Sequence, residues 1–409
     1  MSNLVFAHKK AITRRPYTPN AHEMEVFGLH LLYWKKQRGK SKYRSLINQA
    51  TTIFSVLIAV TFAQQSLSAG QIVTDTITSQ ALKNNKLDDP DTRNMTIYLP
   101  PSYASSDKAY PVVYLLHGFG GNERSLVDEV GEALAILLID GLVNAGLLKE
   151  MIIVMPDGGN KYGGSYYVNS ELTGNYEDYI ADELVNYIDG KYRTIRDRDG
   201  RAIAGASMGG YGSITLAMKH QETFSAVASL SPPLGFDIIS EAMIPEVIKE
   251  NPDGMSEPWP DAEQYTRYIY ALSAALSPNL SNPPFFVDLP FEYPSGEIIE
   301  SVRQRWLVAD PLTMLSVYSS SLMEMNGIYI DVGDEDLPGF KAAADVFHQE
   351  LVSIGIDHKY DVYHGDHHAN AVGRAISALT FLSDLLPAAP SVVRYVRKLP
   401  IAWGVIRER

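Results

Sequence analysis

The stretch Arg201–Ser213, RAIAGASMGGYGS, is the part of the sequence that decides the fold. Residues 201–204 suit a short buried strand, residues 205–209 match the pattern G-x-S-x-G, and Tyr211–Lys219 has the character of a helix. A nucleophilic serine on a strained strand-to-helix turn needs small neighbours, because strand and helix pass close together. These small neighbours are Gly205, Ala206, Gly209 and Gly210. The stretch predicts Ser207 on such a turn; the alternative is a glycine-rich turn with an ordinary serine.

Apolar runs alternate with helical patterns on both sides of this stretch. The strands expected first, Gln71–Ser79 and Asn94–Leu99, are predicted to pair antiparallel at a sheet edge. Further strands are expected at Tyr110–Leu116, Met151–Met155, Phe224–Leu230, Gly327–Val332 and Lys359–Tyr363. Further helices are expected at Asn122–Leu147, Asn175–Tyr192, Phe340–Ile354 and Ala371–Leu386. This alternation predicts an α/β fold with a mostly parallel sheet and helices on both faces.

Three regions are expected along the chain. Residues 1–69 form a basic extension, residues 70–388 form the α/β domain, and residues 389–409 form a basic tail. Within the domain, residues 234–310 are rich in proline and aromatic side chains and contain only short helical patterns, notably Ile298–Leu307. We interpret residues 234–310 as an inserted, lid-like segment over the carboxyl edge of the sheet.

The amino-terminal extension contains one uncharged apolar run, Ile53–Ala63, after a basic flank. The run is too short to span a bilayer as a helix, which takes about 20 residues. With Thr61-Phe62-Ala63 as a cleavage site it describes a secretory signal, which predicts export to the periplasm or the exterior and a mature chain that begins near Gln64. Two alternatives are a retained membrane anchor and a buried helix, and the long basic flank leaves Met24 as a candidate translation start.

Composition limits the partners. The net charge is −13 although residues 1–69 are basic, so the remainder is strongly acidic and suits neither nucleic acid nor anionic lipid. A membrane is expected as a partner only if the apolar run is retained as an anchor. The absence of cysteine excludes disulfides, thiolate metal sites and a cysteine nucleophile.

Two loops lie where the partners of a nucleophilic serine are needed. A serine hydroxyl requires a general base, usually histidine, which a carboxylate orients. In chain order an acid then a histidine should follow the serine, each on a loop after a strand. The acidic loop 333–337, GDEDL, and the loop 364–368, HGDHH, occupy those places.

Backbone donors for a developing oxyanion are also predicted. The N–H of Met208, directly after the serine, is one candidate, and Phe119 in the sequence His117-Gly118-Phe119-Gly120-Gly121 is the other. That glycine-rich loop follows the strand expected at Tyr110–Leu116. The alternative for this loop is a plain turn at a strand end.

Three segments together resemble a known family. YLPPSY at residues 98–103, YPVVYLLHG at residues 110–118 and GASMGG at residues 205–210 are similar to the esterase family of α/β-hydrolases, which includes S-formylglutathione hydrolases, feruloyl and acetyl esterases, enterochelin esterases and mycolyltransferases. The resemblance covers roughly residues 71–386, without much of the insertion. It implies an α/β-hydrolase fold, no metal, and a triad of Ser207, Asp336 and His367.

The acid and the base keep the family's spacing with two departures. Residues 331–336, DVGDED, have Val332 where the family has cysteine, and residues 365–367, GDH, have Asp366 where the family has glycine. Asp334 and Glu335 remain alternative acids, and His368 is the alternative base.

Substrate contacts are expected from two segments. MPDGGNKYGGSYYVNS, residues 155–170, follows another strand, and its candidates are Asp157, Tyr166, Tyr167 and Asn169. In the insertion, aromatic side chains alternate with prolines, and the candidates there are Phe285, Phe286, Phe291 and Tyr293. The alternative for both sets is that these side chains pack a turn or hold the insertion on the domain.

The leading hypothesis is a serine carboxylesterase without a cofactor, acting on a small-molecule or carbohydrate ester. An acyltransferase to a sugar hydroxyl would use the same triad. A binding module with this fold would be expected to lack a triad residue, and none is missing. A glutathione thioesterase is disfavoured by the apparent export signal.

Overall fold

The computed structural model describes residues 69–254, 260 and 262–390. The predicted signal or anchor at residues 53–63 and residues 391–409 of the basic tail lie outside the described residues. Every described residue belongs to one compact unit.

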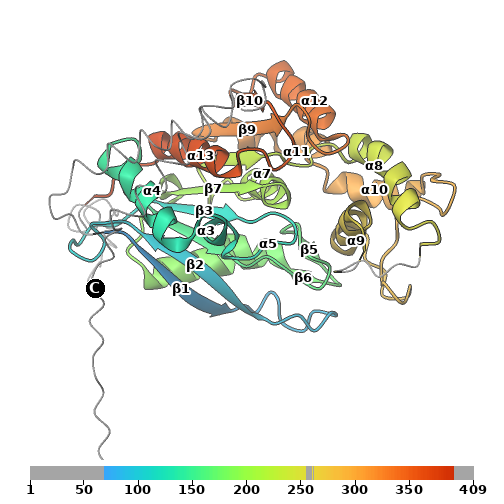
Figure 1. Cartoon of the computed structure of the whole chain (residues 1–409), viewed down its shortest axis with the longest axis horizontal. Coiled ribbons are helices and arrows are strands. Elements are labelled where there is room, and N and C mark those ends of the chain that lie inside the picture. Colours follow the sequence, from blue (N-terminus) through green and yellow to red (C-terminus); the bar gives the residue numbers. More distant parts are fainter. Residues whose placement is uncertain (1–68, 255–259, 261, 391–409) are drawn as a thin grey trace, which may run out of the picture. The chain divides into compact units, whose positions relative to one another are not determined.

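A single eight-stranded sheet, in the order β1-β2-β4-β3-β7-β8-β9-β10, forms the centre of this unit (Figure 1). β1 pairs antiparallel with β2, and β2 pairs antiparallel with β4, whereas all the other neighbours are parallel. The predicted antiparallel edge pair and the mostly parallel sheet are confirmed. The strands are β1 (Gln71–Thr78), β2 (Thr92–Leu99), β3 (Val112–Leu116), β4 (Ile152–Pro156), β7 (Arg201–Ala206), β8 (Ala226–Leu230), β9 (Gly327–Gly333) and β10 (Lys359–Tyr363). A separate small ribbon joins β5 (Asn169–Ser170) to β6 (Gly174–Asn175).

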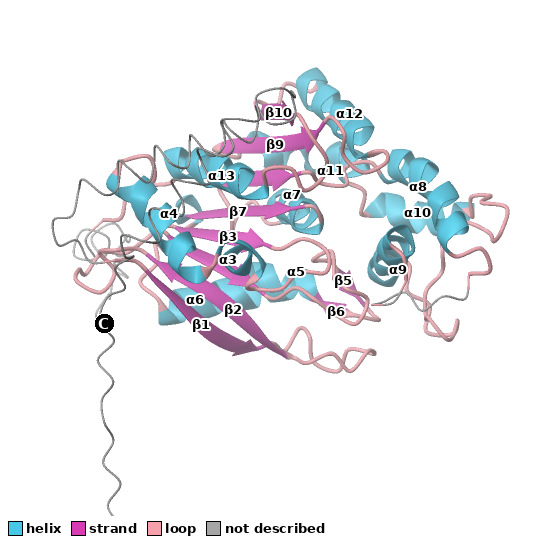
Figure 2. Ribbon diagram, viewed as in Figure 1, coloured by secondary structure: helices cyan, strands magenta, loops and turns pink. Residues whose placement is uncertain are grey.

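Helices cover both faces of the sheet (Figure 2). Along β3 the side chains of Val112, Tyr114 and Leu116 enter one hydrophobic core, and those of Val113 and Leu115 enter the other, as the two-residue period of a strand requires. The core of Val113 is covered by α3 (Ser125–Val130), α4 (Glu132–Asn144) and α13 (Ala371–Leu385). The core of Tyr114 is covered by α6 (Val185–Lys191), α7 (Met208–Lys219) and α12 (Phe340–Ser353).

Two predicted helices are interrupted. The helix expected at residues 122–147 is two helices, α3 and α4, because Gly131 between them has φ 85° and ψ 139°, which no helix contains. The helix expected at residues 175–192 begins as α5 (Tyr176–Asp178) and passes through a π-helical segment, η1 (Tyr179–Leu184), before α6. A short 3₁₀ helix, η2 (Arg198–Gly200), precedes β7.

The insertion is more helical than its prolines indicate. It contains α8 (Phe236–Glu250), α9 (Gln264–Leu276) and α10 (Glu300–Val308), and α11 (Pro311–Met323) follows. The prediction of only short helical patterns is therefore wrong. α8 continues through Pro245 because Phe236, Ile239, Met243 and Val247 recur at helical spacing and are all buried. Tertiary burial outweighs the hydrogen bond that a proline removes.

The sheet order places a crevice next to β3. From β3 the chain adds β4 on one side, then β7, β8, β9 and β10 in turn on the other. In open α/β sheets, ligands bind at the carboxyl ends of the strands where the order reverses in this way. The loop after β3 and the turn after β7 therefore meet at the position that the fold favours for a site.

Candidate active site

Ser207 occupies the sharp turn between β7 and α7. Its φ of 57° and ψ of −118° are values that residues other than glycine rarely adopt. Its N–H donates to the carbonyl oxygen of Leu230 at 2.7 Å, which ties the turn to the end of β8. The strained strand-to-helix turn that the G-x-S-x-G pattern predicts is therefore present.

Two glycines allow the strand, the turn and the helix to approach one another. A Cβ atom on Gly205 would lie 2.2 Å from the carbonyl oxygen of Gly209. A Cβ atom on Gly209 would lie 2.2 Å from the carbonyl oxygen of Leu116 in β3. Both distances are far inside van der Waals contact, so any larger residue at either position would displace the backbone around Ser207.

His367 and Asp336 form a buried pair beside this turn. Nδ1 of His367 lies 2.5 Å from Oδ1 of Asp336, and their side chains are 6% and 0% exposed. The Asp336 carboxylate also accepts hydrogen bonds from the N–H groups of Gly333 and Leu337. Burial raises the pKa of Asp336, but the hydrogen bonds from His367 and the two backbone groups outweigh it, so the pKa lies below its usual value. Asp336 is therefore ionised at neutral pH and holds His367 with its Nδ1–H toward the carboxylate.

The other candidate acids and the other histidine lie differently. Asp334 accepts hydrogen bonds from His364 and from the N–H of Gly365, so it joins the two loops at their exposed side. Glu335 is exposed. His368 is exposed and also lines the cleft. Of the two neighbouring histidines, it is His367 that contacts the carboxylate of Asp336. The geometry therefore favours Asp336 and His367 among the alternatives.

A second buried network lies beneath the histidine loop. Arg374 of α13 donates to both carboxylate oxygens of Asp331 in β9, at 2.9 and 2.7 Å. The same guanidinium donates to Oγ of Ser231 at 2.7 Å and to the carbonyl oxygen of His367 at 3.2 Å. Tyr363 completes the network, since its hydroxyl lies 2.8 Å from Oγ of Ser231 and 3.4 Å from Oδ2 of Asp336. The backbone of His367 and the carboxylate of Asp336 are thus held by one connected set of side chains.

The loop after β3 lies directly against the serine turn. A Cβ atom on Gly118 would lie 3.3 Å from the carbonyl oxygen of Ala206 and 3.5 Å from Cβ of Ser207. The loop is anchored through the imidazole of His117, whose Nε2 accepts a hydrogen bond from the N–H of Gly158 at 2.8 Å. Because Met208 is the first residue of α7, its N–H belongs to the electropositive end of that helix. The two predicted oxyanion donors, Phe119 and Met208, therefore stand on backbone segments that adjoin Ser207.

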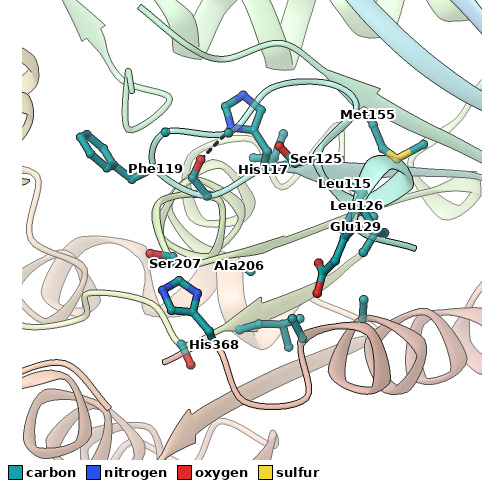
Figure 3. A pocket seen from close by; sticks show the side chains of 18 of the residues that line it. Leu115, His117, Phe119, Ser125, Leu126, Glu129, Met155, Ala206, Ser207 and His368 are labelled. Atoms are coloured by element: carbon teal, nitrogen blue, oxygen red, sulfur yellow. Dashed lines mark hydrogen bonds between the residues drawn. The ribbon is translucent and has the colours of Figure 1, made fainter. Parts of the chain in front are cut away.

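A cleft of about 360 Å³ opens between these loops (Figure 3). Ser207, His367, His368 and the whole loop 117–121 line it. The segment that follows this loop adds polar side chains to the lining, namely Asn122, Glu123, Ser125 and Glu129. The volume is in the range of small-molecule binding sites.

The predicted substrate residues near β4 are mostly structural. Asp157 accepts hydrogen bonds from Arg93, at 3.3 Å, and from the N–H of Gly159. The ring of Tyr167 is fully buried, and its hydroxyl donates to the carbonyl oxygen of His117 at 2.9 Å. Neither residue lines the cleft, so both support the loop after β3. Tyr166, by contrast, lines a smaller cavity that Ser207 also lines.

The predicted aromatic residues of the insertion lie apart from Ser207. The ring of Phe285 packs edge-on against Tyr270 of α9, and its carbonyl oxygen accepts a hydrogen bond from Tyr162. Phe286 is 36% exposed, and Phe291 is buried against Tyr293. None of these aromatic residues of the insertion lines the cleft or the smaller cavity. The insertion does reach the site, but through α8 and α9, whose residues Ile239, Met243, Tyr268 and Leu272 sequence reasoning missed.

Among the described residues, no group of three or more histidine, aspartate and glutamate side chains is placed to hold a metal ion. In that same part of the chain, no helix combines the length and the apolar character needed to cross a membrane.

The strained serine turn after β7 and the order of the parallel strands define an α/β-hydrolase. Within that class the chain belongs to the esterase family, since the family model described as "Putative esterase" matches residues 90–378. The resemblance seen in the sequence is confirmed, and the enzyme class of the family is that of carboxylic-ester hydrolases.

Two curated relatives share part of the chain. Esterase Rv1288 of Mycobacterium tuberculosis is 38% identical over 143 residues, which are 34% of this chain and 29% of that protein. An endo-1,4-beta-xylanase/feruloyl esterase of Xylanibacter ruminicola is 32% identical over 177 residues, which are 39% of this chain and 23% of that protein. The matches span less than a third of the length of either relative.

Solved structures share the fold over most of the chain. A ferulic acid esterase superposes with a TM-score of 0.55 at 23% identity, covering 78% of this chain and 100% of that one. The serine hydrolase FphF of Staphylococcus aureus superposes with a TM-score of 0.51 at 20% identity, covering 76% of this chain and 99% of that one. At these identities the likeness establishes the α/β-hydrolase fold.

Proposed function

We propose that this chain is a serine carboxylesterase in which Ser207 is the nucleophile, His367 the general base and Asp336 the acid that orients the base. One observation carries the proposal: a buried contact of 2.5 Å with Asp336 holds His367, which lines the same cleft as Ser207. A histidine held in this way through Nδ1 has its Nε2 lone pair available as a base.

In the first step Oγ of Ser207 attacks the ester carbonyl carbon while Nε2 of His367 takes the hydroxyl proton. The carbonyl oxygen becomes an oxyanion, which the N–H groups of Met208 and Phe119 stabilise. His367 then donates its proton to the alkoxide oxygen of the leaving alcohol, and the C–O bond breaks. The products of this half-reaction are the free alcohol and an ester between Ser207 and the acyl group.

In the second step water takes the place of the alcohol. His367 removes a proton from the water as its oxygen attacks the acyl carbon, and the same donors stabilise the second oxyanion. The proton returns to Oγ of Ser207 as the acyl-enzyme collapses to a carboxylic acid. Asp336 stays ionised throughout and stabilises the imidazolium.

The substrate is a small-molecule ester, and we propose that its alcohol part is polar, as in an acylated carbohydrate. The cleft wall formed by Asn122, Glu123 and Glu129 supplies acceptors and donors for hydroxyl groups. The relative from X. ruminicola is named for both a xylanase and a feruloyl esterase, which supports an ester with a carbohydrate alcohol.

Ser207→Ala tests the proposal. The variant should remain folded and lose esterase activity by a factor on the order of 10⁶ in kcat, because triad members act as a unit. His367→Ala should lose nearly as much, and His368→Ala, the matched control on the neighbouring residue, should lose far less. Hydrolysis of p-nitrophenyl acetate is the assay. Turnover by Ser207→Ala at the wild-type rate would refute the assignment, and reversed effects of the two histidine variants would move the base to His368.

A second assay, with sugar esters as substrates, separates hydrolysis from acyl transfer. With acetylated and feruloylated sugars as donors and free sugars added as acceptors, a hydrolase releases carboxylic acid at a rate that the acceptor does not change. Formation of a new sugar ester at the expense of free acid would make the chain an acyltransferase that uses the same triad.

A further inference from the structure

A second cavity adjoins Ser207. Its volume is only about 10 Å³, against about 360 Å³ for the open cleft. The two share Phe119, Ser207 and Tyr268, but His367 and His368 line only the larger cleft. The rest of its wall is mostly apolar and includes Met208, Ile239, Met243, Leu272 and Phe340.

The chemistry of the proposed triad assigns a different part of the substrate to each space. His367 must deliver a proton to the oxygen of the leaving alcohol, so the alcohol part has to lie on the side where His367 is. The oxyanion is directed to the N–H groups of Phe119 and Met208. The remaining substituent of the carbonyl carbon is the acyl chain. We assign it to the small cavity, which Ser207 lines and which the ring of Phe340 separates from the His367 imidazole, with the two ring centroids 5.3 Å apart.

The small cavity limits the length of the acyl chain. A volume of about 10 Å³ is about the minimum that one water molecule needs, which suits a methyl group and not an aromatic ring. The open cleft, by contrast, has the volume of a site for a sugar or an aromatic alcohol. The two spaces together therefore fit an ester of a bulky alcohol and an acyl group of about two carbons.

Helices α8 and α9 of the insertion close the small cavity. Ile239 and Met243 of α8 are each 2% exposed, and Leu272 of α9 is 3% exposed. Tyr268 of α9 packs edge-on against Phe119, with ring centroids 4.9 Å apart. α8 also lies close to the residue before α12, because a Cβ atom on Gly339 would lie 2.9 Å from Cα of Ile239. These walls are therefore in close contact with their neighbours, which opposes opening for a longer chain.

We propose that this esterase selects acetyl-sized acyl groups and that Met243 of α8 and Leu272 of α9 set this limit. The proposal rests on the triad assigned above, because the triad decides which space receives the acyl chain. It distinguishes this chain from the ferulic acid esterase that shares its fold, whose named acid is aromatic.

The first test compares acyl groups on one alcohol. We expect kcat/KM for p-nitrophenyl acetate to exceed that for the butyrate by a factor of about 10 or more, since one methylene in a closed pocket is worth roughly 10- to 200-fold. On methanol as the common alcohol, kcat/KM for methyl acetate should exceed that for methyl ferulate by a larger factor. Equal or higher kcat/KM for butyrate or ferulate would overturn the proposal.

The second test opens the cavity. Met243→Ala and Leu272→Ala should each raise the ratio of kcat/KM for butyrate over acetate by about 10-fold. Val247→Ala is the matched control, because Val247 is a buried residue of α8 that lines neither space. It should leave the ratio at the wild-type value.

Truncation of buried residues lowers stability, so the melting temperature of each variant is measured at the same time. If Met243→Ala does not fold, the ratio of kcat/KM for butyrate over acetate is measured in Met243→Val, which is a smaller truncation. A ratio that changes as much in Val247→Ala as in Met243→Ala would refute the role of the cavity. Failure of the proposed function would look different: no p-nitrophenyl ester would be hydrolysed at all, or Ser207→Ala would retain activity.

Discussion

Arg374 is at the centre of the buried network beneath His367. Its guanidinium connects α13 to Asp331 in β9, to Ser231 after β8 and to the carbonyl oxygen of His367. Burial raises the pKa of Asp331, and the ion pair with Arg374 opposes that change. Each charge therefore depends on the other, because both side chains are almost fully buried.

Asp331→Asn should destabilise the protein and disturb the histidine loop. Removing one member of a buried ion pair leaves an uncompensated charge, which costs about 3 to 5 kcal/mol of unfolding free energy. Because Arg374 holds the backbone of His367, kcat for ester hydrolysis should fall as well. Urea unfolding and steady-state kinetics measure the two effects.

Asp128→Asn is the control for that experiment. Asp128 also pairs with an arginine, Arg124, but its side chain is 59% exposed. Exposed pairs contribute at most about 1 kcal/mol, so stability and kcat should both stay near the wild-type values. If Asp331→Asn changed stability no more than Asp128→Asn does, the buried network would not support the site.

The nucleophile could be predicted from the sequence and its supporting network could not. Ser207 has a local pattern because strain and close approach restrict its immediate neighbours to small residues. The acid loop follows β9, which is recognisable as an apolar run, and the histidine loop follows the next strand, β10. Arg374, Ser231 and Tyr363 obey no local sequence rule. The pairing of β8, β9 and β10 and the packing of α13 on this part of the sheet bring them together.

At the scale of elements, Asp310 connects α8, a helix of the insertion, to α11, the helix that follows the insertion. It is the N-cap of α11, where its carboxylate accepts hydrogen bonds from the N–H and the hydroxyl of Thr313. The same carboxylate accepts a hydrogen bond from the N–H of Phe236, the first residue of α8. Burial raises the pKa of Asp310 to about 6, although these hydrogen bonds oppose the shift.

The stability of the protein should therefore depend on the ionisation of Asp310. An acid whose pKa is higher in the folded state than in the unfolded state binds its proton more tightly when folded. Its contribution to stability is fully present below the unfolded pKa of 3.8 and is lost as the pH rises through about 6. The full change is on the order of 3 kcal/mol, since one pKa unit corresponds to about 1.4 kcal/mol.

Asp310→Asn removes this titration and keeps a capping residue. Unfolding free energies of wild type and variant are measured at pH 4 and at pH 7. Between these values the wild type should lose up to about 3 kcal/mol relative to the variant. The same pH dependence in both proteins would show that Asp310 does not titrate in this range.

Strands were easier to predict than the helices of the insertion. Strands buried on both faces appear as continuous apolar runs, which flanking turns delimit. α8 was missed because Pro245 is an ordinary helix breaker, and only burial on the domain explains why the helix continues through it. α11 had a usable signal, since Asp310-Pro311 combines a favourable N-cap with proline at the first helical position.

At the scale of the whole molecule, we propose that residues 70–388 form the catalytic domain and that residues 1–69 direct its export. The first strand of the sheet begins a few residues after the predicted cleavage site. The N–H of Gly70 donates to Oδ2 of Asp140 at 2.8 Å, and β1 starts at Gln71. Cleavage after Ala63 would leave the sheet and its edge strand complete.

Leu57→Arg tests the export signal. Leu57 lies within the apolar run Ile53–Ala63, and a charge there is costly in the apolar environment that a signal must enter. The wild-type protein from its native host should begin near Gln64 and appear outside the cytoplasm. Leu57→Arg should retain its amino terminus and stay in the cell, whereas Leu57→Ile, the matched control, should be processed as the wild type is. N-terminal sequencing of each cell fraction decides the matter, because an intact wild-type chain in the cytosol would refute export and an intact one in the membrane fraction would favour an anchor.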